Sequence, residues 1–202
     1  EIKSIISFSC FVWNVEILKG VSEKLMKKGF VCIAGGPEIT AHPSFYKGFD
    51  YTVSGEGEVS VPLLIKKIIG MKTESENNFL LQNENVIISK SPDLSVIHSP
   101  YLDGIIDPFE YEGALWELAR GCPFKCAYCY ESKGEKTVRL FPMERIKAEL
   151  ELFAKKKVRQ VFVLDPTYNV NKKRAVELLK MIAEKTPDTF YYFEARAEFI
   201  DR

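Results

Sequence analysis

The chain has 202 residues, of which 46% are hydrophobic, and its 28 basic side chains balance 28 acidic ones. This balance gives no excess of positive charge of the kind that binds nucleic acid or an anionic membrane surface. No apolar run approaches the roughly 20 residues that span a bilayer. Because nothing at the start reads as a signal peptide, we expect a soluble cytoplasmic protein with one large or two small domains. The chain opens on Glu1 and stops at Arg202 just after a strand-like run, so we expect a fragment of a longer protein.

Residues 1–70 read as alternating buried strands and amphipathic helices. Almost continuous apolar runs at 5–12 and 30–34 predict strands buried on both faces of a parallel sheet. Between them, Asn14 can cap a helix whose predicted apolar stripe is Ile17, Leu18, Val21 and Leu25, and Gly29 supplies a left-handed stop. Together they form a βαβ unit, in which Cys10 and Cys32 are expected as core residues rather than reactive thiols.

Two glycine-rich turns follow predicted strand ends in this region. The first is Gly35, Gly36, Pro37 and Glu38; the second is Gly55, Glu56 and Gly57, after a strand at 50–54 and before a helix at about 60–69. Open parallel sheets bind ligands at strand carboxyl ends, and glycine lets a ligand approach the backbone. The turns nevertheless lack the GxGxxG order and a phosphate loop. Glycine at such turns also serves backbone geometry alone, so both readings stay open.

Periodicity weakens after Gly70. Polar residues and three spaced prolines predict an extended linker over 71–113, with a short strand at Val86–Ile88. Beyond it, strands are expected at 114–119, 160–164 and 191–196, and helices at about 143–157 and 172–184. The predicted apolar stripe of the first helix is Ile146, Leu150 and Phe153, and that of the second is Ala175, Leu178, Leu179 and Ile182. Strand and helix alternate as at the start of a barrel or an open sheet, where chemistry collects at strand carboxyl ends.

The segment Arg120–Tyr130, called the cysteine loop below, follows the first of these strands. It places Cys122, Cys126 and Cys129 in a CxxxCxxC spacing. Three thiolates suit an iron–sulfur cluster and leave one iron of a cubane free, whereas structural zinc takes four protein ligands and no fourth lies nearby. The spacing favours a cluster, with zinc or unligated thiols as alternatives.

At these residues the chain resembles the radical S-adenosylmethionine (SAM) superfamily, whose signature has an aromatic residue where Tyr128 stands. The run Ala119–Pro123 is similar to the form common in members with a cobalamin-binding domain. The resemblance implies that the three cysteines hold a [4Fe-4S] cluster, that SAM binds its fourth iron, and that Tyr128 lies near the adenine. It also implies reductive cleavage of SAM to a radical that abstracts hydrogen from an unknown small-molecule or peptide substrate, with flavodoxin or ferredoxin as electron donor.

The GGPE turn and the later DYTVSGEGE run resemble the second half of a cobalamin-binding domain, although no DxHxxG motif is present. By that resemblance, turns at 7–9, 35–38 and 54–58 line the cobalamin. The implied fold is α/β: residues 1–70 are the C-terminal half of a Rossmann-like cobalamin-binding domain, 71–113 a linker, and 114–202 the first half of a partial (β/α)6 TIM-type radical SAM barrel.

Three charged residues at predicted strand ends complete the candidate site. Asp165 stands where the resemblance implies contact with the SAM amino group, and capping of the following loop is the alternative. Glu194 and Arg196, two apart on a predicted strand, share a face, so we expect either cofactor contact or an ion pair inside the barrel.

The function expected from these features is cobalamin-dependent radical SAM chemistry, such as radical methylation. The alternatives are a radical SAM enzyme without cobalamin and a non-catalytic zinc- or cluster-binding interaction module.

Overall fold

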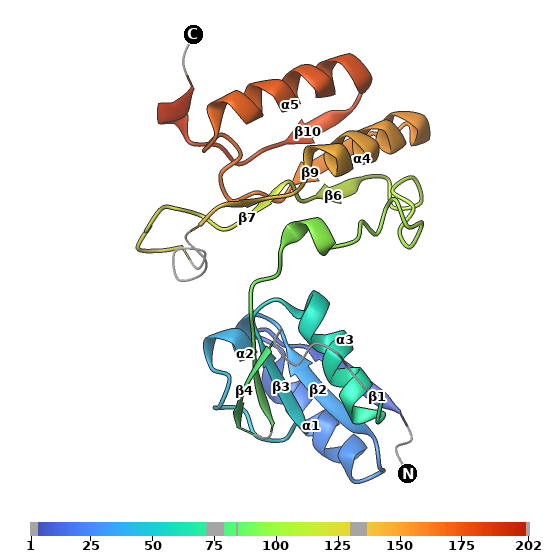
Figure 1. Cartoon of the computed structure of the whole chain (residues 1–202), viewed down its shortest axis with the longest axis vertical. Helices are drawn as coiled ribbons and strands as arrows, with labels where there is room; N and C mark the ends of the chain where they lie inside the picture. Colours follow the sequence, from blue (N-terminus) through green and yellow to red (C-terminus); the bar gives the residue numbers. More distant parts are fainter. Residues whose placement is uncertain (1–3, 72–78, 84, 130–136, 201–202) are drawn as a thin grey trace. The chain divides into compact units, whose positions relative to one another are not determined.

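A computed structural model describes residues 4–71, 79–83, 85–129 and 137–200, and the chain divides into two compact units (Figure 1). The N-terminal unit comprises Glu1–Asp93 and the C-terminal unit Leu94–Arg202. Among the helices described, none is both long enough and apolar enough to cross a membrane.

The N-terminal unit is built on a five-stranded sheet with the order β1-β2-β3-β5-β4. Its strands are β1 (Ile5–Ser9), β2 (Val31–Gly35), β3 (Tyr51–Ser54), β5 (Val86–Ser89) and β4 (Phe79–Asn83). Neighbouring strands pair in parallel except for the edge strand β4, which is antiparallel to β5. The predicted parallel pairing of the first two strands is confirmed, with Ile6 opposite Cys32.

Helices cover both faces of this sheet, because successive side chains of a strand point to opposite sides. Helix α1 (Val15–Met26) and the short α2 (Pro37–Ala41) contribute to a core with Cys10, Cys32 and Ala34. On the other face, α3 (Gly57–Ile68) packs through Leu64 against Ile33 and Val53. Both cysteines are fully buried, as expected for core residues.

The stripe predicted for the first helix is only partly right. Leu18 and Leu25 pack on the core, but Ile17 is 69% exposed and Val21 is 41% exposed. The helix instead buries Val15 and Ser22, so its inward face is rotated from the one that the largest apolar residues indicate.

Part of the predicted linker belongs to the N-terminal sheet. Strands β4 and β5 both fall within 71–113, and the division between the units lies after Asp93. Val86 and Ile87 are buried, and the burial of these apolar side chains stabilises the pairing of β5 with β3. The polar run at 72–78 lies outside the described residues.

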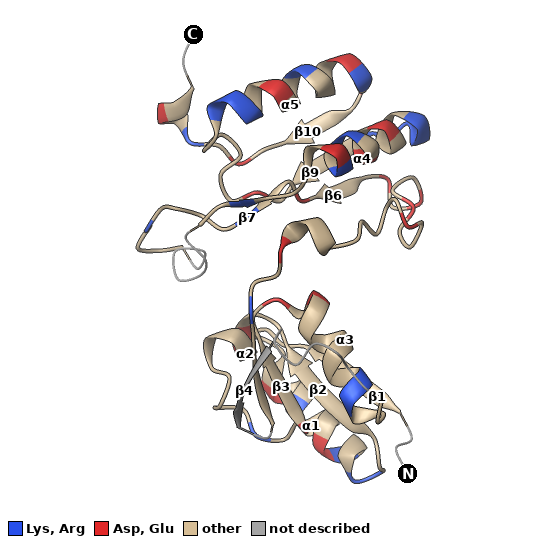
Figure 2. Ribbon diagram, in the orientation of Figure 1, with Lys and Arg blue, Asp and Glu red and all other residues tan. Residues whose placement is uncertain are grey.

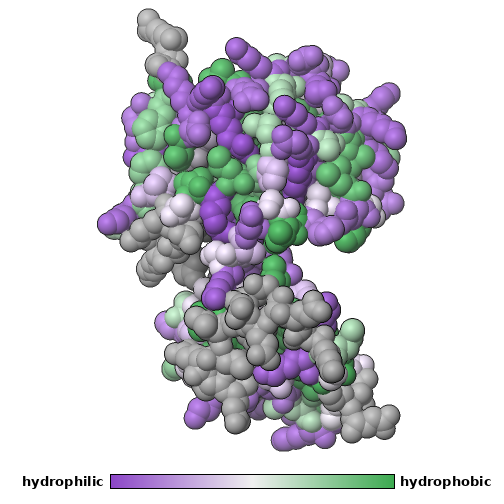
Figure 3. All heavy atoms as spheres, viewed as in Figure 1, coloured by the Kyte–Doolittle hydropathy of each residue, from purple (hydrophilic) through white to green (hydrophobic). Residues whose placement is uncertain are grey.

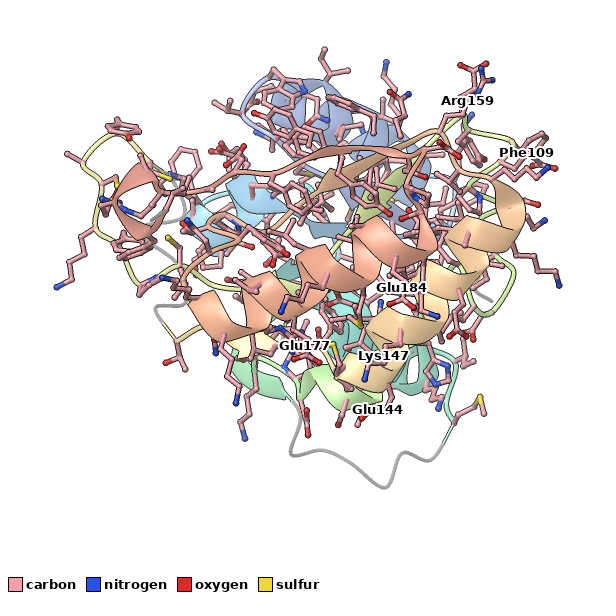
Figure 4. The ribbon with its side chains drawn as sticks, turned by 90° about the horizontal axis from the view of Figure 1, so that it is seen from above. Phe109, Glu144, Lys147, Arg159, Glu177 and Glu184 are labelled. Carbon is pink, nitrogen blue, oxygen red and sulfur yellow. The ribbon has the colours of Figure 1, made fainter. Side chains whose placement is uncertain are left out.

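The C-terminal unit has a three-stranded parallel sheet in the order β10-β9-β6, formed by β6 (Ala114–Trp116), β9 (Gln160–Val163) and β10 (Phe190–Tyr192). Helices α4 (Met143–Lys156) and α5 (Lys172–Lys185) lie side by side over one face (Figure 1). Their outer surfaces carry charged residues, among them Glu144 and Lys147 of α4 and Glu177 and Glu184 of α5 (Figure 4).

The core of this unit lies between the helices and that face of the sheet. Ile146, Leu150 and Phe153 of α4 are fully buried, which confirms the predicted stripe of that helix. The α5 stripe is confirmed at its buried positions, whereas Leu179 is 44% exposed.

Glu149 of α4 turns inward and is 1% exposed. One of its carboxylate oxygens accepts a hydrogen bond from Trp116 Nε1 at 2.8 Å, and the other accepts one from Arg145 Nε at 2.9 Å. Burial of a charge requires such partners.

Candidate functional site at the carboxyl edge of the C-terminal sheet

The cysteine loop leaves the sheet just after β6. Its base is closed by an antiparallel pair of two-residue strands, β7 (Ala119–Arg120) and β8 (Arg139–Leu140). The ion pair of Arg120 with Glu117, at 2.8 Å between Nε and Oε1, lies at the same base. The predicted strand at 114–119 is therefore interrupted, because its last part pairs with a different partner from its first part.

The three thiols differ in exposure. Cys122 is 8% exposed, whereas Cys126 and Cys129 are partly exposed, and none of the three forms a disulfide. The Cys129 N–H donates to the Cys126 carbonyl at 3.1 Å, which makes a turn between them. Tyr128, between the last two cysteines, is 94% exposed.

Three thiols in one short loop have the donor chemistry that a [4Fe-4S] cluster requires. In the described part of the chain, however, no three His, Cys, Asp or Glu side chains converge as a metal-binding group. The three sulfurs of the loop therefore do not form a closed set in this structure.

Asp165 connects the end of β9 to the start of the cysteine loop. Its Oδ1 accepts hydrogen bonds from the backbone N–H groups of Leu118, at 2.8 Å, and Ala119, at 3.0 Å. The side chain is 5% exposed, and burial raises the pKa of its carboxyl group to about 6, while the two backbone hydrogen bonds oppose that rise. Asp165 therefore holds the segment that leads into the loop, and its predicted contact with SAM stays a prediction.

Glu194 and Arg196 lie beyond the third strand, which ends at Tyr192 and not at residue 196 as predicted. The alternation of a strand consequently does not orient them. Glu194 is exposed, and its carbonyl accepts a hydrogen bond from Tyr168 N at 2.8 Å. The side chain of Arg196 pairs with Glu198, whereas an ion pair between Arg196 and Glu194 was the expected alternative to cofactor contact.

Three residues in or near the loop were not singled out from the sequence. Thr167 Oγ1 lies 3.9 Å from Cys122 Sγ, Asn169 bonds to the backbone of Arg196, and Phe124 lies under its guanidinium. The turn Asp165–Asn169 was the available signal, because polar residues after a buried strand collect at its carboxyl end.

The sheet face opposite the two helices is apolar and exposed. Leu115 of β6 is 62% exposed, and Phe162 and Tyr192 stack with their ring centroids 4.4 Å apart. A cavity of about 870 Å³ is lined by these three side chains together with Arg145 and Glu149. In Figure 3 hydrophobic patches interrupt the hydrophilic surface of this unit, and Figure 2 shows charges of both signs along α4 and α5.

In the N-terminal unit, the glycine turns pack closely against neighbouring backbone. Gly36 has a φ of 102°, and a Cβ there would lie 2.7 Å from the carbonyl oxygen of Cys10. Gly55 has a φ of 91°, and its N–H donates to Thr40 Oγ1 at 3.0 Å. Backbone geometry is thus a sufficient reason for glycine at both positions.

The carboxyl ends of β1 and β2 lie together at the first of these turns, Gly35–Glu38. Cys10 N donates to the Gly35 carbonyl at 2.7 Å, and Glu38 N donates to the Cys10 carbonyl at 3.1 Å. The segment after β1 also carries a stacked pair, Phe11 and Trp13, with ring centroids 4.7 Å apart.

The fold and the loop define an α/β protein with parallel sheets and a loop of three cysteines at the carboxyl edge of one of them. Residues 116–201 match the family described as the radical SAM superfamily, and this segment contains the whole cysteine loop. Through that segment the chain is similar to the radical SAM superfamily.

Two curated relatives align with 89% of the chain. One is the cobalamin-dependent radical SAM methyltransferase TokK of Streptomyces tokunonensis, which is 29% identical; the other is the 2-(S-pantetheinyl)-carbapenam-3-carboxylate methyltransferase of Streptantibioticus cattleyicolor, which is 28% identical. The chain spans only about 30% of the length of each.

Among solved structures, the radical SAM methyltransferase TsrM of Kitasatospora setae, solved with cobalamin and a [4Fe-4S] cluster bound, is similar to this chain with a TM-score of 0.61. The similarity covers 92% of this chain and 41% of that one at 16% identity, so it concerns the fold. It confirms the predicted α/β class with parallel sheets.

Proposed function

We propose that this chain is part of a cobalamin-dependent radical SAM enzyme that carries out radical methylation or a related C–H transformation. The observation that carries the proposal is the cysteine loop, which lies at the carboxyl edge of a parallel sheet inside the segment matched to the superfamily. The methyltransferase names of the two curated relatives support the reaction type.

In this proposal Cys122, Cys126 and Cys129 hold the cluster. A bound [4Fe-4S] cluster would supply the electron that cleaves SAM reductively. The chain's own residues position the cluster loop and shield the reacting groups. Asp165 fixes the backbone that enters the loop. The apolar face of Leu115, Phe162 and Tyr192 keeps water from the reacting groups. We propose that this face is the interior of a partial (β/α)6 barrel. SAM contacts by Tyr128, Asp165, Glu194 and Arg196 are part of the same hypothesis.

We further propose that the N-terminal unit is a Rossmann-like half of a cobalamin-binding domain, with the cofactor over the turns at Gly35–Glu38 and Gly55–Gly57. The support is topological, because helices cover both faces of its sheet and the turns lie at strand carboxyl ends. A cytoplasmic location and a flavodoxin or ferredoxin as electron donor remain predictions.

The test of the cluster is anaerobic reconstitution of the full chain with iron and sulfide. We expect visible cluster absorbance, and its loss in Cys126→Ala. The buried Cys32→Ala, in the other unit, serves as the control and should keep the absorbance. An unchanged spectrum in Cys126→Ala would reject the ligand assignment, and stoichiometric zinc without iron would favour the interaction module.

The test of the second cofactor is titration with hydroxocobalamin. Binding at micromolar concentrations supports the cobalamin-dependent enzyme, whereas no binding at those concentrations favours a radical SAM enzyme without cobalamin.

A further inference from the structure

The side chain of Arg196 reaches from the end of the third strand to the cysteine loop. Its guanidinium carbon lies 4.0 Å from the centroid of the Phe124 ring, and Phe124 stands between the first and second cysteines. The guanidinium pairs with Glu198, which is the main cause that raises the pKa of Arg196, and Cys126 is close enough to contribute to the same rise. A cation over an aromatic face is attracted to it, so the contact with Phe124 holds the positive charge of Arg196 against the cysteine loop, two residues before Cys126.

The backbone of Arg196 is fixed as well. Asn169 Oδ1 accepts a hydrogen bond from Arg196 N at 2.9 Å, and Asn169 Nδ2 donates one to the Arg196 carbonyl at 2.9 Å. The Asn169 amide thus binds both backbone groups of Arg196, as a neighbouring strand would. Because Asn169 is only 8% exposed, both hydrogen bonds are shielded from water. The turn after β9 thereby sets the place from which Arg196 extends.

Hydrogen bonds to the sulfurs of an iron–sulfur cluster help to set its reduction potential. Reduction adds one electron and no proton to the cluster, so a donor and a positive charge at a ligand sulfur stabilise the reduced state more than the oxidised state. The external electron would come from a low-potential one-electron donor, for which dithionite serves in the laboratory.

We propose that Arg196, positioned by Asn169, donates a hydrogen bond to the Cys126 thiolate of the bound cluster and makes the cluster easier to reduce. This inference rests on the proposed function, because it needs a cluster on the three cysteines. It gives Arg196 a role toward a protein ligand that is separate from any contact with SAM.

The test is a potentiometric titration of the anaerobically reconstituted full chain, followed by electron paramagnetic resonance, with iron and sulfide determined for each sample. In Arg196→Gln we expect a full cluster whose reduced-to-oxidised ratio at a fixed potential falls about tenfold, a lowering of about 59 mV for a one-electron couple. Arg196→Lys should recover part of the shift, and Asn169→Ala should lower the potential in the same direction.

Lys125→Gln is the matched control, because it removes an exposed cation from the same loop. Its potential should stay near that of the native chain. A native potential in Arg196→Gln, or an equal fall in Lys125→Gln, would overturn the inference while leaving the cluster assignment intact. A native chain that takes up no iron and sulfide would overturn the proposed function and this inference with it. If Arg196→Gln does not hold a cluster, Arg196→Lys replaces it in the test: a lowered potential supports the inference, and a native potential overturns it.

Discussion

Replacement of Asp165 tests how the entry to the cysteine loop is held. In Asp165→Ala, the N–H groups of Leu118 and Ala119 lose their acceptor in a buried place. Each unsatisfied buried polar group costs about 1–3 kcal/mol, so for the two N–H groups we expect the free energy of unfolding of the C-terminal unit to fall by about 2–6 kcal/mol. Asp165→Asn retains an acceptor oxygen and should lose much less.

The same carboxyl group predicts a pH dependence of defined sign. Burial raises its pKa from 3.8 to about 6, so between these pH values the folded state keeps a proton that the unfolded state has released. The free energy of unfolding should therefore fall as pH rises through this window, by about 3 kcal/mol in all. Asp165→Asn should remove this contribution.

The assay is urea unfolding of the full chain, followed by the fluorescence of Trp116, which is 1% exposed, in a Trp13→Phe background. Trp13 belongs to the other unit and is 73% exposed, so its removal leaves a signal from the C-terminal unit. If Asp165→Ala unfolds at the native midpoint, the two hydrogen bonds do not hold the loop entry. If Asp165→Asn keeps the full pH dependence, another group causes it.

Three further predictions concern the scaffold, each measured by urea unfolding and hydrogen exchange. Glu149→Ala should cost about 3–5 kcal/mol, because it leaves Arg145 without its buried partner; a loss under about 1 kcal/mol would contradict this. Gly36→Ala should lower the free energy of unfolding more than Gly29→Ala. Both glycines have a positive φ, but of the two only Gly36 would bring a Cβ against neighbouring backbone. Equal losses would show that this close approach does not matter. Tyr101→Phe removes the hydroxyl that donates to Leu115 O at 2.7 Å and accepts from Leu115 N at 3.0 Å, and we expect a loss of about 1–3 kcal/mol with faster exchange at Leu115; native exchange there would refute the role.

The strand and helix order could be predicted because buried parallel strands and amphipathic helices leave strong local patterns. Ile146 and Leu150 face the core at helical spacing, and Val161 and Val163 are buried in β9. Phe162 between them is 39% exposed, however, so the continuous apolar run overstates the burial of one face of this strand. The inward face of α1 could not be predicted in the same way, because a small residue such as Ser22 can be buried where helix and sheet approach closely, while Ile17 stays exposed.

The candidate site was predictable where the ligand types themselves are informative. Three cysteines at this spacing carry their chemistry in the sequence. The contacts around them do not, because they join residues far apart in the chain: Asp165 to Leu118, Asn169 to Arg196, and Arg196 to Phe124. Only the folded sheet brings these partners together.

These contacts link the ends of all three strands of the C-terminal sheet. Asp165, after β9, bonds to the backbone that leaves β6, and Asn169, in the same turn, bonds to the segment that follows β10. Arg196 of that segment returns to the cysteine loop. Residues in one network couple in their energetic effects, so changes at Asp165 and Arg196 should not add independently in a measurement made on the loop. The sheet alone holds the loop only where it leaves β6. The turn after β9 adds two contacts, because Asp165 binds the entry of the loop and Asn169 positions Arg196 against Phe124.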